Sequence, residues 1–250
     1  MTGGDDGGGR PPDDRPPAVD GDPTFGDTWV YEGLVGGIPG LGLTARGAVA
    51  VQVAVFEALV LGVGVGYGLS GRALAAGTVA VAVAAAGSVA MLRIGAAARG
   101  VDLPSAHSRL LFGSSVEVLF GVLSFAALTT YLLAGGRPTP LAALIGAGGD
   151  PPAPVVFVAL LLLWDVCYRS GTAWWTALVS LWRSLRYRVD GETARRCRRI
   201  DAATAGFALL ELALVPVVWG DPLLVGAVVG HVVAVAAVST AATVLLGRNE

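Results

Sequence analysis

The chain has 250 residues, of which 54% are hydrophobic and only 14% are charged, and its formal net charge is −2. Soluble domains carry about 25% charged residues. A chain with so few charges cannot cover a water-facing surface of its own size, so the composition excludes an ordinary soluble domain. It favours a protein whose solvent is lipid. The 36 glycines fit this class, because small residues let helices approach closely in a membrane.

The first 27 residues are rich in Gly, Pro and Asp and hold almost nothing to bury, which predicts a disordered acidic tail over residues 1–27. This segment lacks the basic and apolar regions of a cleavable signal. Residues 28–40 follow as a predicted interfacial helix, because Trp29 and Tyr31 stand at the edge of an apolar stretch, where such side chains favour the headgroup layer.

Residues 41–248 are predicted to form the membrane domain. A spanning helix needs about 20 apolar residues, and six segments reach that length. They are residues 47–69, 73–92, 110–133, 154–182, 201–219 and 222–246. Residues 138–147 are apolar but too short to span, and are expected to form a short external segment. The predicted fold is therefore an all-α, polytopic membrane protein built as a six-transmembrane-helix bundle.

The arginines indicate the orientation of this bundle. Lysine is absent, so all 17 basic residues are Arg. Six spans place twelve arginines close to the membrane on one side, against Arg72 and Arg137 on the other. The twelve are Arg46, Arg93, Arg99, Arg109, Arg183, Arg186, Arg188, Arg195, Arg196, Arg198, Arg199 and Arg248. Because positive charge stays on the cytoplasmic side, the sequence predicts a multi-pass protein of the cell membrane with both termini in the cytoplasm.

Six ionisable residues fall inside the predicted spans, where each costs about 2.5–3.5 kcal/mol at a helix centre. Such groups face the bundle interior or a wet cavity and are functional candidates. They are Glu57, Glu117, Asp165, Arg169, Glu211 and His231, which together form a candidate buried polar cluster. Four carboxyl groups face one permanent cation, so some are expected to be neutral. One hypothesis is that Glu57 or Glu211 exchanges a proton near neutral pH and couples it to transport.

Two of these groups have structural interpretations as well as functional ones. Asp165 and Arg169 are four residues apart and share a helix face. They form either a pair that neutralises itself or a hub at which Arg169 meets other carboxylates or an anionic ligand. His231 is either a structural histidine bonded to a neighbouring helix or a proton relay with Glu211 or Glu57.

Two further patterns have mainly structural meaning. Three small-xxx-small faces, Gly62–Gly66, Gly64–Gly68 and Gly226–Gly230, are expected to permit tight packing within the chain. Residues 183–199 hold the densest basic cluster and are expected to form a solvated loop that sets topology. Contact of this Arg183–Arg199 loop with anionic lipid headgroups is an additional expectation, whereas binding of nucleic acid is not expected beside a membrane.

Enzyme motifs are absent from the sequence: HExxH, GxSxG, a P-loop and CxxC do not occur. The two cysteines, Cys167 and Cys197, fall in different kinds of segment, and a lone His231 makes a poor metal ligand set. We therefore expect no enzymatic activity, no metal site and no cofactor.

Several stretches carry a resemblance. They are Thr28–Glu32, Leu110–Glu117 and Trp164–Arg169 continuing to Trp174-Trp175. In these the chain resembles a family of haloarchaeal multi-pass membrane proteins of unknown function. The resemblance implies a membrane location and a salt-loving source, and it brings no activity or ligand.

Three functions are compatible with these patterns. The leading hypothesis is a small transporter or permease-like protein that uses the buried polar cluster. The alternative is a non-catalytic membrane subunit or scaffold, in which the buried charges lock helices together. An intramembrane enzyme is the third and least favoured hypothesis, since no nucleophile or metal set is visible. The substrate and any protein partners are left open by the sequence.

Overall fold

The structure, a computed structural model, describes Trp29 and residues 44–134 and 138–248. The predicted tail (1–27) lies outside the described residues, and so does the predicted interfacial helix (28–40) apart from Trp29. Every regular element in the described ranges is an α-helix or a 3₁₀-helix. Trp29 is buried within the protein: its side chain is 1% exposed, its ring contacts Phe112, and its indole nitrogen donates to the carbonyl oxygen of Leu111.

The predicted six-span bundle is confirmed, since six helical segments are long and apolar enough to cross a membrane. The described elements are α2 (Ala45–Gly66), α3 (Gly71–Arg99), α4 (Ser105–Phe112), α5 (Val116–Leu133), α6 (Pro140–Ile145), α7 (Ala153–Arg186), α8 (Gly191–Leu210), the 3₁₀-helix η1 (Glu211–Leu214), α9 (Val215–Val218) and α10 (Pro222–Arg248). The third span consists of α4 and α5, and the fifth of α8, η1 and α9.

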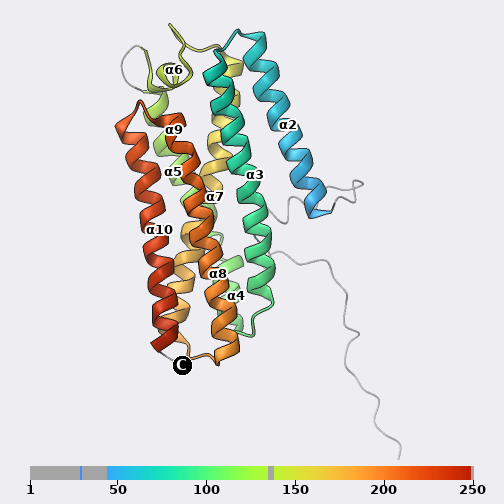
Figure 1. Cartoon of the computed structure of the whole chain (residues 1–250), viewed down its shortest axis with the longest axis vertical. Coiled ribbons are helices and arrows are strands. Elements are labelled where there is room, and N and C mark those ends of the chain that lie inside the picture. The colour runs from blue at the N-terminus through green and yellow to red at the C-terminus, as the bar shows by residue number, and fades with distance from the viewer. Residues whose placement is uncertain (1–28, 30–43, 135–137, 249–250) are drawn as a thin grey trace, which may run out of the picture.

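Helix α7 is the central element of the bundle. It contacts α2, α3, α4, α5, α8 and α10. Figure 1 shows that α6 and the α2–α3 turn lie at one end of the bundle, whereas α4, the start of α8 and the C-terminus lie at the other. We call these the α6 end and the arginine end; the latter carries the exposed residues Arg99, Arg186, Arg195 and Arg248.

The bundle is packed more tightly towards the arginine end. In α7, twelve of the fifteen buried residues lie between Cys167 and Ser184, and only three lie in the half that starts at the α6 end. In α10, five of the six buried residues follow His231. The largest hydrophobic core cluster includes Met91, Phe112 and Val179, which belong to the same half. The helices are therefore closed around one another at the arginine end and separate towards the α6 end.

The fifth span changes its helical form beside a proline. Helix α8 gives way to η1 at Glu211, and α9 begins at Val215 with Pro216 in its first turn. Proline has no N–H to donate and its ring clashes with the carbonyl one turn earlier, so a continuous α-helix cannot pass this point without distortion. Short 3₁₀ segments inside long helices often mark functional sites or strain. The distortion places Glu211 at the first residue of the altered segment.

Residues 183–199 do not form the solvated loop that was predicted. Helix α7 continues to Arg186, and α8 begins at Gly191, ten residues before the predicted span. The Asp190 side chain accepts hydrogen bonds from the backbone N–H groups of Glu192 and Thr193, which caps the start of α8. The prediction was wrong because it placed helix ends by apolarity, whereas this end is fixed by an N-cap on a polar turn.

Of the glycines in the predicted small-residue faces, Gly64 packs closely, since a Cβ there would lie 2.2 Å from the Leu74 side chain on α3. Four members of the predicted small-residue faces, Gly62, Gly66, Gly226 and Gly230, have open space where a Cβ would lie. Two helix backbones approach each other closely where α5 meets α7. A Cβ on Gly171 would lie 2.7 Å from the backbone nitrogen of Gly121 and 2.8 Å from the carbonyl oxygen of Glu117.

Candidate functional site

Glu211 lies in the middle of the bundle, where the fifth span is distorted. Its side chain is almost fully buried, and the residue is 3% exposed. The Ser170 hydroxyl on α7 donates a hydrogen bond of 2.9 Å to Oε1, and Nε2 of His231 on α10 lies 2.9 Å from Oε2. The imidazole nitrogen is close enough for an ion pair but is not aligned for a hydrogen bond. Three helical segments therefore converge on one carboxyl group.

A cavity of about 580 Å³ extends from the α6 end to this group. Its walls come from α2, α3, α5, α6, α7, η1, α9 and α10, and they are formed mainly by Val, Leu, Ala and Gly residues. Ser170, Glu211 and His231 line it, together with Trp174, whose ring meets the His231 ring edge-on with 6.2 Å between centroids. The looser packing near the α6 end is the physical reason for the cavity.

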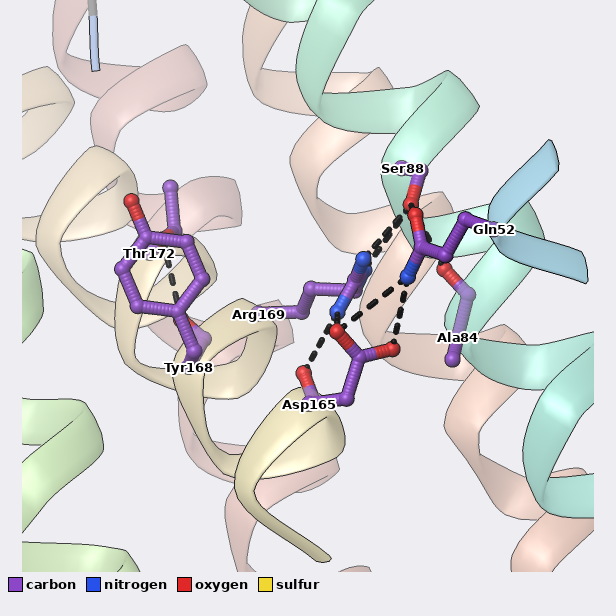
Figure 2. A network of polar contacts seen from close by, with 7 residues as sticks. All are labelled: Gln52, Ala84, Ser88, Asp165, Tyr168, Arg169 and Thr172. Carbon is purple, nitrogen blue, oxygen red and sulfur yellow. Dashed lines mark hydrogen bonds and ion pairs between the residues drawn. The ribbon is translucent and has the colours of Figure 1, made fainter. Parts of the chain in front are cut away.

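Arg169 belongs to a separate network, which Figure 2 shows from close by. Its guanidinium pairs with the Asp165 carboxylate one turn earlier on α7, as the spacing predicted. Its Nη2 donates 2.6 Å to the hydroxyl of Ser88 on α3. The Gln52 side-chain nitrogen on α2 donates to both Asp165 oxygens, at 3.0 and 3.2 Å. The network thus joins α2, α3 and α7, and Arg169 is 1% exposed within it.

A second buried ion pair was missed at the sequence level. Nη2 of Arg183 on α7 lies 2.8 Å from Oδ2 of Asp201 on α8, and their side chains are 1% and 0% exposed. The hydroxyl of Thr243 on α10 lies 3.5 Å from the same oxygen. Arg183 had been assigned to a loop, and Asp201 to the first residue of a span. The two residues are 18 positions apart and lie on different helices, so no helical spacing in the sequence indicates that they pair.

Glu57 and Glu117 stand apart from both networks. Glu57 on α2 is only partly buried and accepts a 2.7 Å hydrogen bond from Thr78 on α3. Glu117 on α5 is 0% exposed, and neither carboxyl oxygen has a hydrogen-bond partner. A carboxyl group in such a place costs far less free energy when neutral than when ionised.

The six predicted residues therefore do not form one cluster. They occupy four places: the Asp165–Arg169 network, the Glu211–His231 pair, and the separate sites of Glu57 and Glu117. Of these, only Glu211 and His231 line the large cavity. The helix face shared by Asp165 and Arg169 turns them towards α2 and α3, whereas Ser170, the next residue, faces Glu211. No motif marks Ser170, Gln52 or Ser88, because isolated polar residues in a helix have no characteristic spacing.

The comparison with known families adds a match over nearly the whole chain. Residues 24–242 match the model of DUF7530, a family of unknown function. The chain belongs to the DUF7530 family. No curated protein and no solved structure matches it. This DUF7530 chain is thus an uncharacterised protein with six candidate membrane helices.

Between the fifth and sixth spans of this DUF7530 chain, Asp221 joins two helices. The Tyr131 hydroxyl at the end of α5 donates a 2.6 Å hydrogen bond to Asp221 Oδ2, and Oδ1 accepts from the backbone N–H groups of Leu223 and Leu224 at the start of α10. These hydrogen bonds, the one from Tyr131 first, lower the pKa of Asp221 below its ordinary value. Both cysteines are buried and unpaired, and within the described ranges no three metal-ligating side chains gather.

Proposed function

We propose that this protein is a small membrane transporter whose substrate enters the cavity from the α6 end and reaches Glu211 and His231. The observation that carries the proposal is the cavity itself: it is open through one half of the bundle and ends at a buried carboxyl–imidazole pair. A pathway closed at one end is the arrangement that alternating access requires. The closure lies at the arginine end, where the Arg183–Asp201 pair connects α7 with α8.

The distorted fifth span supports the same proposal. Transporters commonly form their substrate sites at discontinuous helices near the middle of the membrane, because the interrupted segment places polar groups inside the bundle. Here the change from α8 to η1 occurs at Glu211, and the carboxyl group lines the cavity. The arginine end would be cytoplasmic by the positive-inside rule, so the cavity would open to the outside. The haloarchaeal source and the absence of enzymatic activity also stay predictions.

Cysteine accessibility tests the proposal without knowledge of the substrate. In a background with Cys167→Ala and Cys197→Ala, one cysteine is placed in the cavity by Ala227→Cys. Another is placed in the closed half of the same helix by Ser239→Cys; Ser239 is 2% exposed. A membrane-impermeant maleimide is then applied from each side of oriented vesicles. A transporter should give labelling of Ala227→Cys from the α6 side and slower labelling of Ser239→Cys from the arginine side.

A scaffold is the second candidate, and the polar networks favour it. The Asp165–Arg169–Ser88–Gln52 network joins three helices, and the Arg183–Asp201 pair joins α7 to α8. Groups of this kind fix helices relative to one another whether or not anything is transported. The accessibility experiment separates the candidates, because a scaffold should protect Ser239→Cys from both sides indefinitely. The lipid-facing variant Ala237→Cys controls for reagent that partitions into the bilayer.

Anionic lipid headgroups are proposed partners of the arginine end. Arg183 cannot contact lipid headgroups, because it is buried in its ion pair with Asp201. Four other arginines of this end are exposed: Arg186, Arg188, Arg195 and Arg199. Each arginine near an anionic surface contributes about 1 kcal/mol, and salt weakens the effect. Replacing these four by Gln should reduce the anionic lipid that copurifies from mixed vesicles. Arg196→Gln is the matched control, because Arg196 is engaged by Glu192 and by the carbonyl oxygen of Gly100.

A further inference from the structure

The walls of the large cavity determine what kind of molecule fits it. Its volume of about 580 Å³ lies within the range of small-molecule sites, about 300–1,000 Å³. Aliphatic side chains from eight helical elements form nearly all of the lining. A sugar or a hydrated ion would lose hydrogen bonds to water along these walls without replacement. A molecule with an apolar body would instead gain free energy in proportion to the area that it buries.

The polar end of the cavity determines which polar group such a molecule would carry. Glu211 accepts one aligned hydrogen bond, from Ser170 to Oε1, and a carboxylate offers about four acceptor positions. Oε2 has Nε2 of His231 2.9 Å away but no aligned hydrogen bond from it. A buried carboxylate that lines a cavity with unused acceptor positions favours a positively charged or hydrogen-bond-donating group.

The charges around the cavity favour a cationic ligand over an anionic one. Among the described residues that line the cavity, Glu211 is the one acidic side chain, and Arg169 and Arg183 are each paired with an aspartate elsewhere. The Trp174 ring, which also lines the polar end, offers a face of the kind that attracts cations. An anion would meet the Glu211 carboxylate, and none of the described residues that line the cavity is an arginine that could offset this charge.

We infer that the cavity binds a lipophilic cation, a molecule with an apolar body and one positive charge, with its charge at Glu211 and its body between the outer halves of α3, α5, α7 and α10. This inference rests on the proposed function and specifies its substrate class. The binding itself requires only the cavity and the Glu211 carboxylate, so it is measurable without transport.

A pair of ions of the same shape and opposite charge tests the inference. Tetraphenylphosphonium and tetraphenylborate are titrated into the detergent-solubilised full chain, and binding is followed by calorimetry or by Trp fluorescence, to which Trp174 contributes. The cation should bind with saturation and the anion at least tenfold more weakly. Glu211→Gln should weaken cation binding at least about tenfold, equivalent to about 1.4 kcal/mol, while Glu211→Asp should retain most of it.

Matched controls use the other carboxyl groups and another alanine of α10. Glu57→Gln and Glu117→Gln remove acids that do not line the cavity, so they should leave binding unchanged. Ala227→Leu narrows the cavity and should weaken binding, whereas Ala237→Leu adds the same atoms on an exposed face and should not. Thermal unfolding of each variant separates lost binding from lost fold.

Three results would overturn the inference: equal binding of the two ions, binding of neither, or cation binding unaffected by Glu211→Gln in a folded protein. None of them decides the proposed transport function, which depends on two-sided labelling of Ser239→Cys. Conversely, cation binding together with permanent protection of Ser239→Cys would support a lipophilic-cation site in a protein that does not transport.

Discussion

Arg183 and Asp201 form a fully buried ion pair, with 2.8 Å between Nη2 and Oδ2, in the closed half of the bundle. One further polar atom of each residue, Nε of Arg183 and Oδ1 of Asp201, is buried without a hydrogen-bond partner. A small cavity of about 10 Å³, lined by His107, Ser180 and Arg183, lies beside the pair and has room for about one water molecule. The pair is therefore incompletely bonded and depends on its two charges.

Replacing one residue of this pair should destabilise the protein far more than replacing both. Arg183→Met leaves Asp201 buried without a partner, and Asp201→Leu does the same to Arg183. Each single variant should lower the free energy of unfolding by about 3–5 kcal/mol, whereas the double variant should restore most of that loss. Unfolding in mixed micelles with increasing SDS measures all four proteins as a double-mutant cycle. Single variants that cost under about 1 kcal/mol would contradict the ion pair.

The close approach of α5 and α7 should make Gly171 intolerant of a methyl group. The atoms that a Cβ would meet, Gly121 N and Glu117 O, are backbone atoms that cannot rotate away. Gly171→Ala should therefore cost about 1–3 kcal/mol through displacement of the two helices. Gly226→Ala is the matched control in open space, and it should be neutral or stabilising by up to about 1 kcal/mol through helix propensity. Equal stability of the two variants would rule out this contact.

Gln52 should hold α2 against the centre of the bundle. Its amide group reaches Asp165 on α7, and the Ser88 hydroxyl on α3 donates 3.3 Å to its oxygen. Interhelical hydrogen bonds in membranes contribute about 0.6 kcal/mol on average and about 1.7 at most. Gln52→Leu should therefore destabilise within that range and speed hydrogen exchange in α2 selectively. Val51→Leu on the neighbouring, lipid-exposed position should change neither quantity.

The sequence predicted the features that depend on local pattern. Apolar length predicted six spans, and the spacing of four residues predicted the Asp165–Arg169 pair. It did not predict features that depend on how spans meet. Arg183 was assigned to a loop because helix ends were drawn where apolarity stops, although α7 continues to Arg186 and α8 begins ten residues before the predicted fifth span.

The sequence predicted which residues belong to the candidate site, but not which of them lie together. The six residues of the predicted cluster all lie within the spans, yet helix rotation divides them among four places, and the buried Arg183–Asp201 pair was not among them. Rotation depends on contacts such as Gly121–Gly171 and on the distortion beside Pro216, and neither leaves a periodic signal in one sequence. The cavity forms where several helices diverge towards the α6 end, so the sequence of any single helix could not predict it.

The hydrogen bond between Tyr131 and Asp221 should make the stability of the protein depend on pH. Because the pKa of Asp221 is lowered in the folded state, the carboxylate stabilises the fold above its unfolded value of about 3.9. That contribution should be lost as the pH falls through the lower folded pKa, when protonation of the carboxyl group weakens its hold on Tyr131 and on the start of α10. We therefore expect the unfolding temperatures of the wild type and Asp221→Asn to differ most near neutral pH and to converge in acid. Tyr131→Phe removes the hydrogen bond that lowers the pKa of Asp221 most and should move the convergence to higher pH. A difference between wild type and Asp221→Asn that stayed constant from pH 7 to below the folded pKa would show that the charge of Asp221 contributes nothing, and that its hydrogen bonds act equally well without it.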